Sequence, residues 1–122
     1  MSFDTGRFTI SSNGLQTFTL GSFQPTWAIL RSAGVNARIQ FCEGALDGTR
    51  QNCESFYSDG SGSQGFDTNT KCLSMYDRVS GSITEVLSAS FSSFGISSGT
   101  GNITLNVSLS NPNYKVTIEC GD

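Results

Sequence analysis

The alternation of apolar and polar residues near the end of the chain constrains the fold most strongly. In residues 102–109, and again in residues 114–120, every second residue is apolar and its neighbours are polar. This period of two is that of a strand with one buried and one solvated face. Residues 110–113 (Ser-Asn-Pro-Asn) are typical of a turn, because proline fixes φ and asparagine tolerates left-handed backbone angles. The pattern predicts a β-hairpin whose apolar row must be covered by the rest of the chain.

Other segments have strand character, and none is typical of a helix. An Asn-Gly pair at positions 13–14 predicts that the chain opens with a hairpin formed by residues 6–11 and 15–20. Further strands are expected at residues 26–31, 35–41, 53–58, 70–76 and 83–94. The pattern predicts an all-β fold: one domain over residues 1–122, an antiparallel β-sandwich or jelly-roll-like domain of about eight strands.

Two of these segments carry predictions about burial. Residues 26–31, which include Trp27, form a continuous apolar run after Pro25 and predict a strand buried on both faces, with Trp27 in the core. In residues 35–41 the alternation predicts that Val35, Ala37, Ile39 and Phe41 face the core. Two stretches rich in turn residues, 43–51 and 59–65, are expected to be loops, the second one flexible.

Composition excludes several classes of protein. Hydrophobic residues make up 36% of the 122 residues, so the chain can bury a core, and no apolar run is long enough for a membrane helix. The net charge is −3 and the seven Lys and Arg residues are scattered, whereas a nucleic acid or an anionic membrane needs a basic face. The N-terminus has no basic and apolar signal sequence, which predicts a chain made and used without export.

The cysteines and acidic residues predict no metal site and no cofactor. Cys42, Cys53, Cys72 and Cys120 form no C-x-x-C pair, and the chain has no histidine, which disfavours structural zinc. Buried free thiols are favoured over two disulfides, for which three pairings would be open. The Asp-Gly loops at positions 47–48 and 59–60 offer oxygen ligands, but the spacing of a calcium loop is missing.

The sequence also predicts that the protein is not an enzyme. Without histidine there is no Ser-His or Cys-His pair, and no serine occupies a G-x-S-x-G elbow. Carboxylates are frequent enough to suggest a glycosidase pair, but most lie in turn contexts, and their spacing pairs no two of them. These residues are Glu43, Asp47, Glu54, Asp59, Asp67 and Glu85.

Residues for contact with a partner are sought in the first five residues and in the loop 59–67. Phe66, isolated among glycine and serine, is expected to be an exposed anchor. The candidate contact residues are Phe3, Tyr57, Asp59, Gln64 and Phe66.

Three segments, in order along the chain, resemble small β-domains of bacteriophage virion proteins. They are residues 21–31 (GSFQPTWAILR), 90–94 (SFSSF) and 101–108 (GNITLNVS), followed by a final strand. The resemblance implies a virion structural component that is not an enzyme.

The small size of the chain favours a capsid decoration (cement) or head accessory subunit over a host-recognition fibre. Such a subunit would be located in the virion and would bind the major capsid protein as a homo-oligomer, for which a trimer is the expectation. The alternative is a carbohydrate-binding or receptor-binding β-sandwich module at a tail tip or fibre head, using Trp27, Tyr57 or Tyr76.

Overall fold

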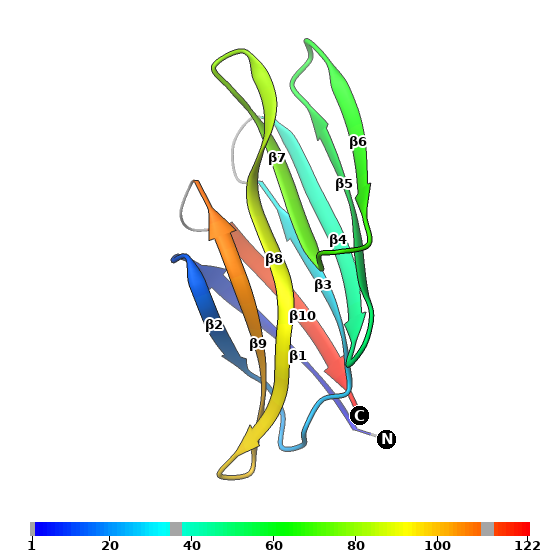
Figure 1. The fold of residues 1–122 in the computed structure, drawn as a ribbon, viewed down its shortest axis with the longest axis vertical. Coiled ribbons are helices and arrows are strands. Elements are labelled where there is room, and N and C mark those ends of the chain that lie inside the picture. Colours follow the sequence, from blue (N-terminus) through cyan, green and yellow to red (C-terminus); the bar gives the residue numbers. More distant parts are fainter. Residues whose placement is uncertain (1, 35–37, 111–113) are drawn as a thin grey trace.

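A computed structural model describes residues 2–34, 38–110 and 114–122, and in these residues the chain forms ten strands and no helix (Figure 1). The predicted all-β class is confirmed, with ten strands in place of about eight. The strands are β1 (Phe3–Ile10), β2 (Gly14–Thr19), β3 (Trp27–Ala33), β4 (Ile39–Asp47), β5 (Gln51–Ser58), β6 (Ser63–Thr68), β7 (Leu73–Val79), β8 (Ser82–Ser97), β9 (Thr100–Leu109) and β10 (Tyr114–Gly121). No helix that could span a membrane is found in the described part of the chain.

The strands form two antiparallel sheets that pack face to face as a β-sandwich. Among the described residues, one sheet has six strands in the order β1-β10-β3-β4-β5-β6, and the other has four in the order β2-β9-β8-β7. The chain termini lie together at one end of the molecule (Figure 1), where the Ser2 backbone N–H donates to Asp122 Oδ1 at 2.6 Å. The middle of the six-stranded sheet lies between β3 and β4, and β1 and β6 are its two edges.

The two predicted terminal hairpins are wrong, although their strands are present. β1 pairs with β10 and β2 pairs with β9, so each supposed hairpin places one strand in each sheet. The cause is that both inner faces of a sandwich are apolar, so the same alternation suits a strand in either sheet. Of the predicted C-terminal turn, residues 111–113 lie outside the described residues.

True two-residue hairpin turns connect β7 to β8 and β8 to β9. Ser80 and Gly81 have φ of 51° and 85°, and Ser98 and Gly99 have φ of 51° and 80°. Positive φ at both central residues is the requirement of a type I′ turn, whose twist matches that of the flanking strands. These turns fix β7, β8 and β9 as a continuous meander in the four-stranded sheet.

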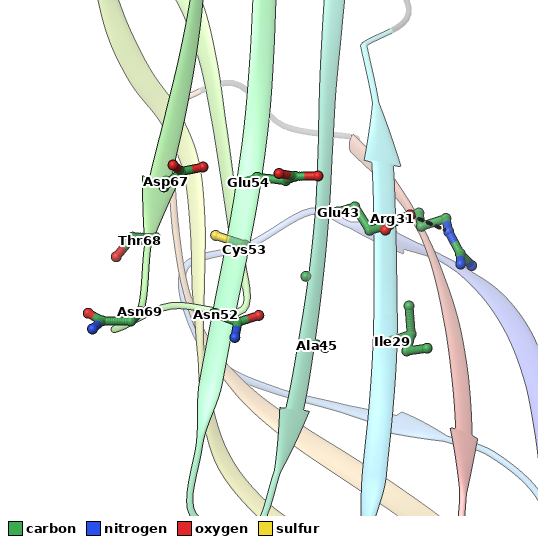
Figure 2. A pocket seen from close by; sticks show the side chains of 11 residues that line it. Ile29, Arg31, Glu43, Ala45, Asn52, Cys53, Glu54, Asp67, Thr68 and Asn69 are labelled. Atoms are coloured by element: carbon green, nitrogen blue, oxygen red, sulfur yellow. Dashed lines mark hydrogen bonds and ion pairs between the residues drawn. The ribbon is translucent and has the colours of Figure 1, made fainter.

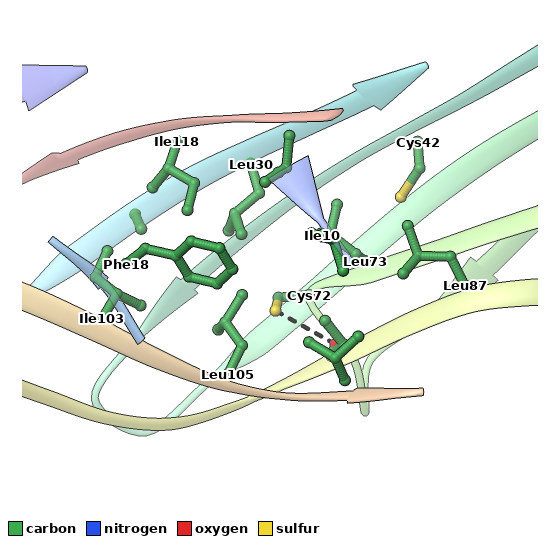
Figure 3. Packing of buried hydrophobic residues seen from close by; sticks show 14 of the residues in the cluster. Ile10, Phe18, Leu30, Cys42, Cys72, Leu73, Leu87, Ile103, Leu105 and Ile118 are labelled. Atoms are coloured by element: carbon green, nitrogen blue, oxygen red, sulfur yellow. Dashed lines mark hydrogen bonds between the residues drawn. The ribbon is translucent and has the colours of Figure 1, made fainter. Parts of the chain in front are cut away.

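The core lies between the sheets and is built from the inward residue of each alternating pair. Leu30 and Ile118 of the six-stranded sheet point toward Phe18, Ile103 and Leu105 of the other (Figure 3). All five side chains are buried, with exposed fractions of 5% or less. Full burial of one such aliphatic side chain contributes about 1.5–3 kcal/mol.

The burial predicted for two segments is wrong. Ile39 and Phe41 are 59% and 40% exposed, and Gln40 and Cys42 face the core instead. Gln40 is buried because its Nε2 donates to the Tyr76 backbone carbonyl at 2.9 Å, a hydrogen bond that needs a polar side chain on the inner face. Val35 and Ala37, predicted with the same face, lie outside the described residues.

The strand of residues 26–31 is buried on one face only. Ala28 and Leu30 face the core, whereas Trp27 is half-buried on the outer face, directly opposite Gly121 of β10. The indole of Trp27 occupies the space where a side chain at position 121 would lie. Trp27 therefore packs on the backbone of the neighbouring strand and not in the core.

Two predicted loops, 43–51 and 59–65, contain residues of strands. β4 continues through Asp47, and residues 63–67 belong to β6, which pairs with β5. The connection between β5 and β6 is short because Asp59 accepts a hydrogen bond from the Ser61 N–H at 2.9 Å, which is local Asp bonding typical of turns. The predicted loop 59–65 thus comprises the turn and the first residues of β6 in a β5–β6 hairpin at one edge of the six-stranded sheet.

Candidate functional site

The outer face of the six-stranded sheet carries the side chains that point away from the core, and we call it the sheet face. It consists of the outward side chains of β1, β10, β3, β4, β5 and β6. Four surface depressions in the described residues are lined mainly by residues of these strands. The strand register arranges the outward residues in rows that run across the sheet.

One row carries charges of opposite sign on the two halves of the sheet. Reading across the strands from β1 to β6, the register places these residues side by side: Arg7, Thr117, Arg31, Glu43, Glu54 and Asp67. Cations therefore lie on β1 and β3, and carboxylates lie on β4, β5 and β6. We call this the charge row.

The charge row is only partly neutralised within the chain. Arg31 Nε donates to Glu43 Oε2 at 2.7 Å, and both side chains are more than 40% exposed, so this ion pair contributes less than about 1 kcal/mol. Arg7, Glu54 and Asp67 form no ion pair with any other residue that the structure describes. Carboxylates directly opposite one another on neighbouring strands repel. The three neighbouring carboxylates of the row therefore destabilise the isolated sheet, and positive charge from a molecule bound to the sheet face would relieve this repulsion.

The next row is apolar. Ala33 of β3, Phe41 of β4, Phe56 of β5 and Gly65 of β6 lie side by side. Phe41 and Phe56 are 40% and 43% exposed and directly opposite each other, and Ile39 lies two residues along β4 from Phe41. We call Ile39, Phe41 and Phe56 the apolar patch. A cluster of large exposed apolar side chains is typical of a protein-binding surface, whereas single ones need no explanation.

A depression of about 650 Å³ lies on the acidic half of the sheet face. Figure 2 shows Glu43, Glu54 and Asp67 at a similar height across three neighbouring strands, with Asn52 and Asn69 below them. The floor is low because Ala45, an exposed outward residue of β4 that lines it, carries only a methyl group. The lining offers hydrogen-bond acceptors, two amides and a small apolar wall at Ile29.

The cysteines are free and buried, in agreement with the interpretation favoured from the sequence. Cys53 also lines the depression, and a hydrogen bond with Cys42 lowers the pKa of the Cys53 thiol. That bond, together with burial, raises the pKa of Cys42. Cys72 donates to the Ala89 carbonyl at 3.3 Å, and burial raises its pKa to about 12. All three thiols therefore lie inside the sandwich and below the sheet face.

The predicted contact residues are not gathered in one place. Phe3 is 72% exposed on the edge strand β1, and Gln64 is exposed on the opposite edge strand β6. Phe66 is half-buried, because its ring stacks on Tyr76 at a centroid distance of 3.7 Å and closes the sandwich at that edge. It is not the isolated anchor expected from the sequence.

Tyr57 and Asp59 belong to an internal polar network. Tyr57 is fully buried, and its hydroxyl donates to Asp59 Oδ2 at 2.9 Å. Arg78 Nε donates to the same oxygen at 2.6 Å, and this hydrogen bond is the main reason why the pKa of Asp59 is far below its usual value. Of the three aromatic residues considered for sugar binding, only Trp27 therefore lies on the sheet face.

Sequence reasoning missed the residues that define the sheet face. The sequence shows that Glu54 and Asp67 are carboxylates, but only the strand register shows that they are neighbours. The sequence pattern predicts a strand for Phe56 without assigning its side chain to a face, and it predicts the inner face for Phe41, which lies on the outer one. The available signal was the alternation in residues 51–58, which puts Tyr57 and Phe56 on opposite faces.

In the described residues, no group of three or more His, Cys, Asp and Glu side chains is arranged to hold a metal ion. Comparison of the chain with protein-family models, with curated proteins and with solved structures gives no match. The fold and the sheet face define the class, a β-sandwich with an apolar and charged outer sheet surface. The resemblance to virion proteins remains a prediction.

Proposed function

We propose that this protein is a structural subunit of a bacteriophage particle, a capsid decoration or head accessory protein that acts through protein–protein contacts and not as an enzyme. The observation that carries the proposal is the apolar patch on the sheet face, in which Ile39, Phe41 and Phe56 are 59%, 40% and 43% exposed. Burying such side chains against another protein stabilises an interface by roughly 25 cal/mol per Å² of apolar surface.

The position of the patch suits a subunit that binds a shell. It lies on regular strands, so its side chains are held by the sheet and need little ordering when they bind. A decoration protein is present in many copies, and weak contacts suffice when many act together. Under this proposal the protein is made in the host cytoplasm and incorporated in the virion, with the major capsid protein as its partner.

The test is incorporation into particles produced by the phage that encodes the chain. Mass spectrometry and cryo-electron microscopy of purified particles should find many copies on the head. A variant carrying Phe41→Ser and Phe56→Ser should be depleted from particles. The matched control is Leu15→Ser, which changes a residue 67% exposed on β2 of the other sheet and should be incorporated normally. Absence of the wild-type chain from the particle would overturn the proposal.

A second candidate function is carbohydrate or receptor binding at a tail tip or fibre head, and the depression on the acidic half favours it. Carboxylates and amides beside Ile29 offer the hydrogen bonds and apolar contact that a small polar ligand requires. A glycan array should then give binding that Glu54→Gln or Asp67→Asn abolishes. An array without signal at high protein concentration would remove this candidate.

A further inference from the structure

We infer that the sheet face binds a second copy of this chain, face to face, around a twofold axis that runs parallel to the strands between β3 and β4. The inference rests on the proposed function only in treating the sheet face as a protein-binding surface, and it names the partner. Three features of the sheet face support such a dimer: the order of charges across the strands, the apolar patch and the size of the face.

The charge row is complementary to itself. A twofold axis between β3 and β4 places each strand opposite its counterpart on the other half of the sheet, so β1 faces β6 of the second copy and β3 faces β4. Arg7 of one copy then faces Asp67 of the other, and Arg31 faces Glu43. The basic half of each copy therefore lies against the acidic half of the other, and the symmetry repeats each of these contacts once.

The same rotation brings positive charge to carboxylates that lack it within one chain. Glu54 and Asp67 form no ion pair in the described residues, and neither does Arg7. Lys115 lies on β10, in the row next to the charge row. In the described part of the chain its ammonium donates a hydrogen bond to the Thr9 hydroxyl and forms no ion pair. A second copy thus places Arg7 opposite Asp67 and Arg31 opposite Glu43, while Glu54 faces Thr117, two residues along β10 from Lys115.

The apolar patch lies next to the charge row, so the two are buried together. Under the twofold axis Phe41 of one copy faces Ala33 of the other, and Phe56 faces the strand that carries Lys115. The small side chain of Ala33 leaves room for the ring, and the alkyl stem of a lysine covers an aromatic ring well.

The size of the face limits the strength of the contact. Six strands at a spacing of about 4.8 Å give a width of about 24 Å, and eight residues give a length of about 26 Å. The flat area is on the order of 600 Å² per copy, somewhat below the roughly 800 Å² of a standard interface. A reversible dimer is expected, formed at micromolar or higher concentration and weakened by salt.

The test is a charge exchange followed by analytical ultracentrifugation of the purified chain over a range of concentrations. Arg7→Glu alone and Asp67→Arg alone should each weaken dimerisation at least about tenfold, because each places like charges opposite each other twice. The double variant R7E/D67R should restore dimerisation, because the charges again alternate between copies. Within one chain positions 7 and 67 lie on opposite edge strands, β1 and β6, so restoration cannot arise there.

Two controls complete the experiment. Asn106→Glu changes the charge on an exposed position of β9 in the other sheet and should leave dimerisation unchanged. Circular dichroism should give the same strand signal for all variants, since neither position 7 nor position 67 makes a described ion pair.

The outcomes separate this inference from the proposed function. A chain that stays monomeric at about 1 mM, forms trimers, or dimerises without rescue by the double variant overturns the inference. If its incorporation into particles still depends on Phe41 and Phe56, the proposed function stands. A dimer restored by charge exchange, in a chain missing from the particle, supports the inference and overturns the proposed function.

Discussion

Replacing Gly44 with alanine should destabilise the protein strongly, because backbone of the other layer, at Cys72, lies directly over this residue. Gly44 lies in the middle of β4 with its free side toward the core, opposite Cys53 of β5. A methyl group there would overlap the backbone carbonyl oxygen of Cys72, the residue that directly precedes β7. That backbone is held in place, since the Cys72 N–H donates to the Ala89 carbonyl at 2.9 Å.

The expected loss of stability depends on which atoms must move to make room for the methyl group. Overpacking a core typically costs about 1–3 kcal/mol, and the upper part of that range applies here, because the obstacle is hydrogen-bonded backbone and not a flexible side chain. We therefore expect Gly44→Ala to lower the free energy of unfolding by about 3 kcal/mol. For a domain of this size the corresponding decrease in Tm is about 10 °C.

Urea unfolding and thermal unfolding measure both quantities, and a second strand glycine provides the matched control. Gly65 lies in β6 on the outer face, where an added methyl would come no closer than 3.8 Å to the Ser55 carbonyl oxygen. Gly65→Ala should therefore be neutral or stabilise by up to about 1 kcal/mol, because alanine loses less backbone entropy on folding. If Gly44→Ala were as stable as wild type, the close approach of the sheets would be refuted.

Three further predictions concern pH, thiols and turns. The Arg78 hydrogen bond lowers the pKa of Asp59 below its usual 3.8, so its contribution to stability is present above that pH and lost as pH falls below it. Asp59→Asn should flatten this acid decline, measured as unfolding free energy against pH, and an unchanged decline would count against the network. The buried thiols, including Cys72 with its pKa of about 12, should react with a thiol reagent only after unfolding, and then as four groups. Fewer than four would indicate a disulfide. Ser98 has φ of 51° in its turn, so Ser98→Asn should raise the unfolding free energy by a few tenths to about 1 kcal/mol, and a loss of stability would contradict the turn type.

The existence of most strands could be predicted from the sequence because alternation reports one buried face directly. The alternation in residues 102–109 and 114–120 predicts two strands, and these residues lie within β9 and β10. Their pairing could not be predicted, because a strand in either sheet of a sandwich shows the same period. The two hairpins that do form here around Ser-Gly turns have no stronger sequence signal than the Asn-Gly pair at positions 13–14, where the chain instead passes between sheets.

The candidate site was harder to predict than the fold, for a physical reason. The charge row joins residues from six strands, and a shift of one position in any strand would remove its member from the row. Arg7 and Asp67, sixty positions apart in the sequence, share a row only because β1, β10, β3, β4, β5 and β6 are in register. No local pattern carries that information.

The one strand whose side was predicted wrongly is also the one that contributes most to the apolar patch. Ile39 and Phe41 alternate as core residues would, yet Gln40 and Cys42 take the inner positions. In a chain surrounded only by water, exposing two large apolar side chains while burying an amide is unfavourable. The buried amide of Gln40 also requires a hydrogen-bond partner, which is the Tyr76 backbone carbonyl. Such a conflict between local pattern and observed burial is expected where a surface is kept for function. The exposure of Ile39 and Phe41 on β4 is therefore an observation, independent of the charge row, that supports the proposed binding of another protein chain to the sheet face.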